Sequence, residues 1–134
     1  MKIFTSLLFV VLAMSLIGCS KEKEFTAFTS ELDAVTKEVA AKIDSNPTAA
    51  GITEAQSLFD SKKAGLKSKW EVIKGLRDYQ VSFDSKRKLQ ASVKDGKDVM
   101  NAACDKAIAN AGGDMDVRNK ADALMTAYEE FFTK

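Results

Sequence analysis

The sequence predicts an all-α protein, most economically an up-down four-helix bundle, and three observations support that prediction. Hydrophobic residues recur at spacings of three and four, with no alternating run long enough for a strand. Proline occurs once and glycine seven times, so the breaks between helices are few. Helices joined by short turns pack as antiparallel neighbours. The main alternative is a three-helix bundle in which residues 69–110 form one long helix.

The first predicted helix of the folded domain runs from about Lys21 to Asp44. Its apolar residues form a single stripe, as a helix that faces a core requires: Phe25, Phe28, Leu32, Val35, Val39 and Ile43. Asn46-Pro47 ends this helix and starts the next, with Asn46 as the predicted N-cap and Pro47 in the first helical position.

The second predicted helix runs from Pro47 to about Tyr79. Its apolar residues recur at intervals of seven: Ile52, Phe59, Leu66 and Ile73. Gly65 and Gly75 each weaken the helix by up to ~1 kcal/mol relative to alanine. Trp70 borders the stripe, so core packing explains its position better than stacking on a ligand.

The third predicted helix begins after Ser82, which is its expected N-cap. Its stripe consists of Leu89, Val93, Met100, Ala103 and Ala107. Gly96, Ala103 and Ala107 leave the middle of this helix small-sided, so a neighbouring helix can approach closely. Cys104 follows this stripe and is expected to be a small buried hydrophobic residue.

A glycine stop and a new N-cap, Ala111-Gly112-Gly113-Asp114, separate the third helix from the fourth. The fourth predicted helix runs from about Met115 to Phe132. Its predicted buried residues are Val117, Ala121, Leu124, Tyr128 and Phe131. Four helices and their turns thus account for residues 21–132.

The first 18 residues form a separate segment with a basic start, Met1-Lys2, and an apolar run from Phe4 to Ile17. The run closes with Leu16-Ile17-Gly18-Cys19, which resembles the lipobox of bacterial lipoproteins. The resemblance implies diacylglycerol transfer to the Cys19 sulfur, cleavage after Gly18, and acylation of the new N-terminus by a fatty acid such as palmitate. An ordinary signal peptide and an uncleaved transmembrane helix are the alternatives, although the run is short for a span of about 20 residues.

On this interpretation residues 1–18 are a lipoprotein signal peptide and residues 19–134 are a single helical domain with a lipid anchor at its N-terminus. Ser20, directly after the lipidated cysteine, resembles the sorting pattern for the outer membrane. The expected location is therefore the cell envelope, at the outer membrane facing the periplasm if the organism has two membranes. Only residues 20–23 separate the lipid from the fold, so we expect the bundle to stand close to the membrane.

Composition excludes several kinds of site. Histidine is absent, which removes histidine-dependent catalysis and histidine ligation of metal or haem. Of the two cysteines Cys19 is assigned to lipid, so Cys104 is left without an intramolecular disulfide partner. We therefore expect no enzymatic activity, no cofactor and no metal.

Charge is unevenly distributed along a chain that is close to neutral. Residues 62–97 hold 11 basic and four acidic residues, and acidic residues dominate on both sides. The basic residues near the predicted turn between the second and third helices form a possible membrane-proximal patch facing anionic lipid headgroups: Lys74, Arg77, Lys86, Arg87 and Lys88. The alternative is charge balance within the bundle. Nucleic acid is not an expected partner, given the overall charge balance.

Two functional classes remain after these exclusions. The leading one is a lipid-anchored, non-enzymatic structural or interaction module, with the membrane and an unidentified envelope protein as partners. The second is a helical bundle at the outer membrane that binds a small molecule or lipid, which would require a cavity.

Overall fold

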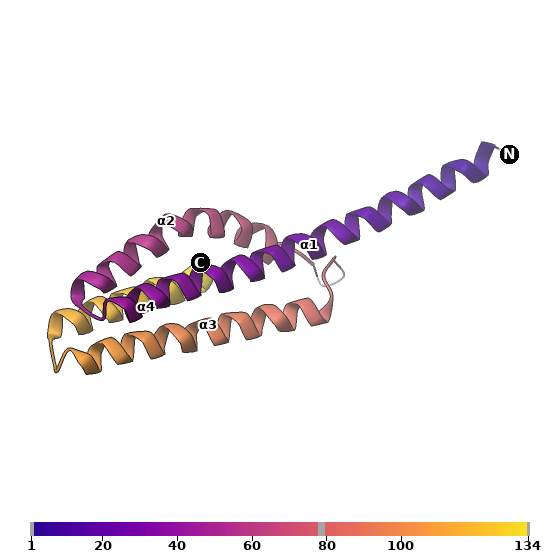
Figure 1. Cartoon of the computed structure of the whole chain (residues 1–134). Helices are drawn as coiled ribbons and strands as arrows, with labels where there is room; N and C mark the ends of the chain where they lie inside the picture. The colour runs from indigo at the N-terminus through magenta and orange to yellow at the C-terminus, as the bar shows by residue number, and fades with distance from the viewer. Residues whose placement is uncertain (1, 78–79, 134) are drawn as a thin grey trace.

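The computed structural model describes residues 2–77 and 80–133 and, within these ranges, the side chains from residue 21 onward. Nearly all of these residues are helical and none lies in a strand (Figure 1). The helices are α1 (Lys2–Ser45), α2 (Ala49–Lys74), α3 (Phe83–Asn110) and α4 (Met115–Thr133). The four-helix prediction is confirmed. The three-helix alternative is wrong, because a linker over residues 75–82 separates α2 from α3.

Helix α1 differs from the prediction at its beginning, which is Lys2 and not about Lys21. The apolar run between these positions contains no proline and continues the helix beyond the bundle (Figure 1). The expected cap at the start of α2 is also wrong. Thr48 is the N-cap, since its hydroxyl accepts a hydrogen bond from the amide of Gly51 at 3.3 Å.

Helix α2 ends at Lys74, earlier than the predicted end near Tyr79, which itself lies outside the described residues. Gly75 is the C-cap residue, so this glycine stops the helix instead of only weakening it. Beyond it Val81, only 5% exposed, packs into the core and fixes the linker to the bundle.

The predicted caps of α3 and α4 are confirmed. The hydroxyl of Ser82 accepts a hydrogen bond from the Ser85 amide at 3.2 Å, and a carboxylate oxygen of Asp114 accepts one from the Asp116 amide at 2.8 Å. Gly112 and Gly113 have φ angles of +57° and +98°. These left-handed conformations favour glycine and turn the chain back sharply.

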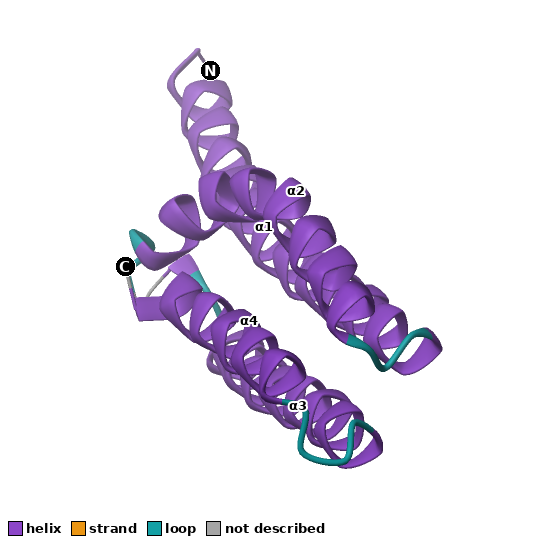
Figure 2. Ribbon diagram, turned by 90° about the vertical axis from the view of Figure 1, so that its left-hand side faces the viewer, coloured by secondary structure: helices purple, strands orange, loops and turns teal. Residues whose placement is uncertain are grey.

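The helices alternate in direction but do not pack in chain order. Helix α1 contacts α2 and α3, and α4 contacts the same two, so α2 and α3 lie on one diagonal of the bundle. Figure 2 shows α1 beside α2 and α3 beside α4. Contacts at both ends, Glu22 with Ser82 and Asp44 with Lys106, make α1 and α3 parallel. Antiparallel neighbours therefore occur only within the α1–α2 and α3–α4 hairpins.

The core has the composition that the sequence predicts. Every residue of the predicted α1 and α4 stripes is buried, together with Ile52, Phe59, Leu66 and Ile73 of α2. In α3 the stripe residue Val93 is only partly buried, while Gly96 is fully inside. All described core side chains lie between Phe25 and Phe131. Among the helices whose side chains are described, none is long and apolar enough to cross a membrane.

Helix α4 is shorter than its neighbour α3. It has 19 residues and α3 has 28, so at 1.5 Å per residue it is about 13 Å shorter. Helix α3 ends, and α4 begins, at the turn of residues 111–114. Among the described helices, α3 therefore extends further than α4 toward the end of the bundle where α1 enters.

Candidate functional site

The N-proximal end of the bundle is formed by residues 21–24 of α1, the last turn of α2, the linker and the first turns of α3. Its central contact is the Glu22 carboxylate, which accepts hydrogen bonds from the Ser82 amide at 3.1 Å and the Ser82 hydroxyl at 2.7 Å. The Ser85 hydroxyl donates to the same carboxylate. Glu22 thus caps α3 from a different helix, at an end where the helix dipole favours negative charge.

These hydrogen bonds lower the pKa of Glu22 below its ordinary value, with Ser85 contributing most, then Ser82, and the nearby charge of Lys88 adding a smaller effect. The residue therefore remains ionised over the physiological range. It offsets part of the positive charge that Lys86-Arg87-Lys88 place at the start of α3.

The structure brings the predicted basic residues to this one end of the bundle, in different surroundings. Lys74 forms an ion pair with Glu71 at 2.9 Å, and Arg77 is held in the linker by mutual hydrogen bonds of 2.9 Å with Gln80. Arg87 lies over the Phe83 ring, 5.0 Å from its centroid.

Lys86 and Lys88 complete the set. Lys86 is half-buried, whereas Lys88 is exposed and borders the hollows between α3 and α1. Residues 21–24 and 71–88 together hold seven basic and five acidic residues. This end thus carries a small positive excess after internal compensation.

Glu129 forms an ion pair with Lys97 at 2.6 Å, midway along α3. It therefore lies away from the basic turn. Residues 20–23, which were predicted to separate the lipid from the fold, are helical and belong to α1. The side chain of Cys19 lies outside the described residues.

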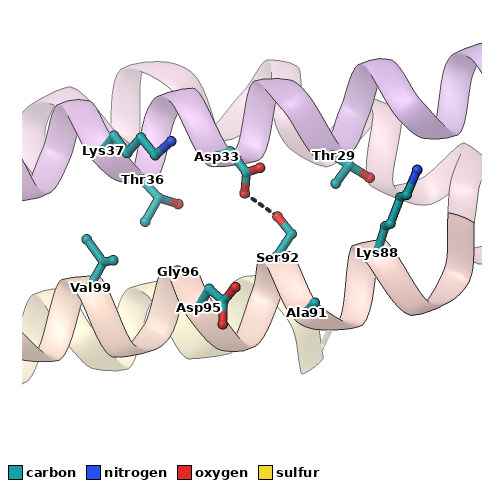
Figure 3. A pocket seen from close by; sticks show the side chains of 10 residues that line it. All are labelled: Thr29, Asp33, Thr36, Lys37, Lys88, Ala91, Ser92, Asp95, Gly96 and Val99. Atoms are coloured by element: carbon teal, nitrogen blue, oxygen red, sulfur yellow. Dashed lines mark hydrogen bonds between the residues drawn. The ribbon is translucent and has the colours of Figure 1, made fainter.

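A cleft of about 380 Å³ runs between α1 and α3 (Figure 3). Charged and hydroxyl side chains of both helices line it, and Ser92 donates a hydrogen bond to Asp33 across it. Asp33 and Asp95 contribute two carboxylates, and Lys37 and Lys88 two ammonium groups. Opposite charges in equal number favour no ion of one sign, and this cleft is open to solvent.

The floor of the cleft explains why α1 and α3 can lie so close together. The hydroxyls of Thr36 and Tyr128 share a hydrogen bond of 3.0 Å across the bundle diagonal. Gly96 faces this pair, and a Cβ there would overlap the Tyr128 Oη. The predicted close approach of a neighbour to the small-sided middle of α3 is therefore confirmed at Gly96. The spacing pattern identified Gly96 as a small residue at a helix contact, but it did not identify Tyr128 as the residue that Gly96 accommodates.

An apolar groove of about 450 Å³ lies between α2 and α3 beyond the end of α4. Its apolar walls are Trp70, Leu89, Val93 and Phe132. Trp70 stacks on Phe28 and meets Phe132 edge-on, with centroids 5.7 and 5.9 Å away. This confirms its predicted packing role. Its indole N–H is buried without a hydrogen-bond partner among the described residues.

Cys104 is 3% exposed, as predicted for a small core residue. Burial, with smaller effects from Asp105 and Asp122, raises the pKa of the thiol to about 11. The thiolate that a metal or disulfide exchange requires is therefore disfavoured. The described side chains also include no cluster of three acidic or cysteine residues able to hold a metal ion.

Comparison of the chain with protein-family models, with curated proteins and with solved structures gives no match.

Proposed function

We propose that the protein is a lipid-anchored component of a bacterial cell envelope, attached through Cys19 and acting as a non-enzymatic interaction or structural module. The residue pattern Leu16-Ile17-Gly18-Cys19 supports the anchor. The Ser20 pattern supports the outer membrane as its site in a two-membrane organism.

The Glu22 cap supports one orientation of the bundle relative to the membrane. Cys19 is three residues before Glu22 on the same helix, or about 4.5 Å along its axis. Glu22 in turn holds Ser82, the residue before α3. The basic residues around this turn would then lie within a Debye length, about 10 Å, of anionic headgroups. Each cation near such a surface contributes ~1 kcal/mol, so the N-proximal end faces the membrane.

Metabolic labelling with a fatty-acid analogue tests the anchor. The wild-type chain should incorporate the label and Cys19→Ser should not. Cys104→Ser is the matched control, because it removes the other cysteine and should leave labelling unchanged. Label retained by Cys19→Ser would refute the anchor at this position.

Vesicle binding by a domain of residues 21–134 tests the orientation. The domain should bind anionic vesicles better than neutral ones, and Lys86/Arg87/Lys88→Glu should lose that preference. The variant Lys42/Lys106/Lys120→Glu changes the net charge equally but at the opposite end, and should retain the preference. Equal binding to both vesicle types would assign the basic turn to charge balance within the bundle.

A second candidate function, binding of a small molecule or lipid, is supported by the apolar groove beyond α4. Trp70 is the chain's single tryptophan and lines that groove, so its fluorescence is a direct probe of occupancy. A saturable change on titration with a single-chain amphiphile, abolished by Val93→Asp, would support this function. No change over the range below micelle formation would exclude it.

A further inference from the structure

Phe83 is an apolar side chain in an unusual position. It is the first residue of α3 and is 71% exposed, more than any other large hydrophobic side chain among the described residues. An isolated exposed hydrophobic residue does not by itself indicate a binding site. The neighbours of Phe83 and its place in the bundle do indicate one.

The first neighbour is Arg87, one helical turn further on. Its guanidinium carbon is 5.0 Å from the centre of the Phe83 ring, within the range of a cation–π interaction. The pair therefore presents an apolar ring beside a delocalised cation whose planar donors match the oxygens of a phosphate. Aromatic rings and arginine are both favoured at the boundary between lipid headgroups and acyl chains.

The second consideration is where this pair lies. Ser82 precedes Phe83 and is tied to Glu22 by two hydrogen bonds, one from its amide and one from its hydroxyl. Phe83 is thereby held beside the part of α1 that directly follows Cys19. Figure 1 shows the start of α3 near the point where α1 leaves the bundle. The exposed ring, the cation and the proposed anchor are at the same end.

We infer that Phe83 and Arg87 form an interfacial wedge that binds a phospholipid bilayer, with the ring in the headgroup–acyl boundary and the guanidinium on a lipid phosphate. This inference rests on the proposed orientation of the bundle and adds a defined point of insertion to it. The occupant is the bilayer because the wedge continues the surface that the anchor places against it. The Glu22 cap holds the start of α3, so the wedge is fixed before it meets lipid.

Fluorescence quenching by brominated phospholipids tests the wedge. The domain of residues 21–134 is held on anionic vesicles by an N-terminal hexahistidine tag and a nickel-chelating lipid, which replace the acyl anchor. Trp70→Phe removes the native indole, whose N–H has no hydrogen-bond partner among the described residues. Phe83→Trp then places the only indole at the wedge. Its emission should fall by about half in brominated vesicles relative to unbrominated ones, as for a ring about 5–10 Å deep in the interface.

The matched control is Trp70→Phe with Met115→Trp, since Met115 is 61% exposed at the opposite end of the bundle. Its emission should not change with bromination. Without the tag, Phe83→Ala should lower partitioning of the domain into anionic vesicles about tenfold. Absence of quenching at position 83, or equal quenching at positions 83 and 115, overturns the wedge.

The tag keeps this result separate from failure of the proposed function. It holds the domain at the surface whether or not Cys19 is acylated and whether or not the basic turn attracts lipid. Loss of acyl labelling or of anionic preference would refute the proposed anchor or orientation. A domain that prefers anionic vesicles but shows no quenching at position 83 would refute the wedge alone.

Discussion

Replacing Gly96 with alanine should destabilise the domain through a single atom, the hydroxyl oxygen of Tyr128. A Cβ at position 96 would overlap that oxygen, whereas its next contact, Thr36 Cγ2, is at an ordinary 3.4 Å. Tyr128 is 1% exposed and its hydroxyl is held by Thr36, so the ring has little room to move. The overlap should therefore be relieved by Tyr128→Phe, which removes only that hydroxyl.

The expected magnitudes follow from this geometry. Overpacking costs about 1–3 kcal/mol, and alanine regains up to ~1 kcal/mol over glycine inside a helix. Gly96→Ala alone should thus lower the free energy of unfolding by about 1–2 kcal/mol. Tyr128→Phe alone should cost about 1 kcal/mol, for the hydrogen bond to Thr36. In the Tyr128→Phe background Gly96→Ala should be neutral or stabilising.

Urea unfolding of the four proteins of this double-mutant cycle, followed by circular dichroism, measures the coupling. The double variant should be about 1–3 kcal/mol more stable than the sum of the two single effects predicts. Gly65→Ala is the control, because a Cβ there meets nothing within 4 Å and should stabilise both backgrounds equally. Additivity of Gly96→Ala and Tyr128→Phe within ~0.5 kcal/mol would refute the role assigned to the hydroxyl.

Three further predictions concern the core. Leu66→Ala and Ile73→Ala should each lower the free energy of unfolding by about 2–5 kcal/mol in urea titrations, and losses below about 0.5 kcal/mol at both would mean that the α2 stripe does not face the core. In the native domain Cys104 should react with a thiol reagent only on unfolding, since burial disfavours its thiolate; rapid reaction at a pH of about 8 would contradict this. The free energy of unfolding should fall as the pH rises above about 9, because burial raises the pKa of both Cys104 and Tyr128 and the unfolded chain loses these protons first. Thermal melts across this range should show a shallower decline in Cys104→Ser and in Tyr128→Phe, and identical slopes in all three proteins would contradict the assignment.

Periodicity predicted the core because every helix has one apolar face. The α1 and α4 stripes are buried residue for residue, and α2 keeps Ile52, Phe59, Leu66 and Ile73 inside. Boundaries were less predictable, since several residues near each break can end or cap a helix. The N-cap of α2 is Thr48 and not the predicted Asn46, and the helix ends at Gly75 and not near Tyr79.

Arrangement in space was the part that local pattern could not supply. Short turns imply antiparallel neighbours, but nothing in the sequence near the linker shows that α3 crosses to the far side of α1. The Glu22 cap depends on that crossing, because it joins residues 60 and 63 positions apart. The same holds for the overlap between Gly96 and Tyr128. Contacts of this kind follow from tertiary structure and have no signature in spacing.

The diagonal position of α2 and α3 has a consequence for how the chain reaches its fold. Each hairpin, α1–α2 and α3–α4, brings together residues close in sequence, so each can form from local contacts, which form fastest. The covalent connection between the two hairpins is the linker of residues 75–82. If that linker were straightened, two chains could exchange hairpins and keep every interhelical contact, as in domain swapping. The Glu22–Ser82 hydrogen bonds and buried Val81 hold the linker against the bundle, and so favour docking within one chain over exchange between two.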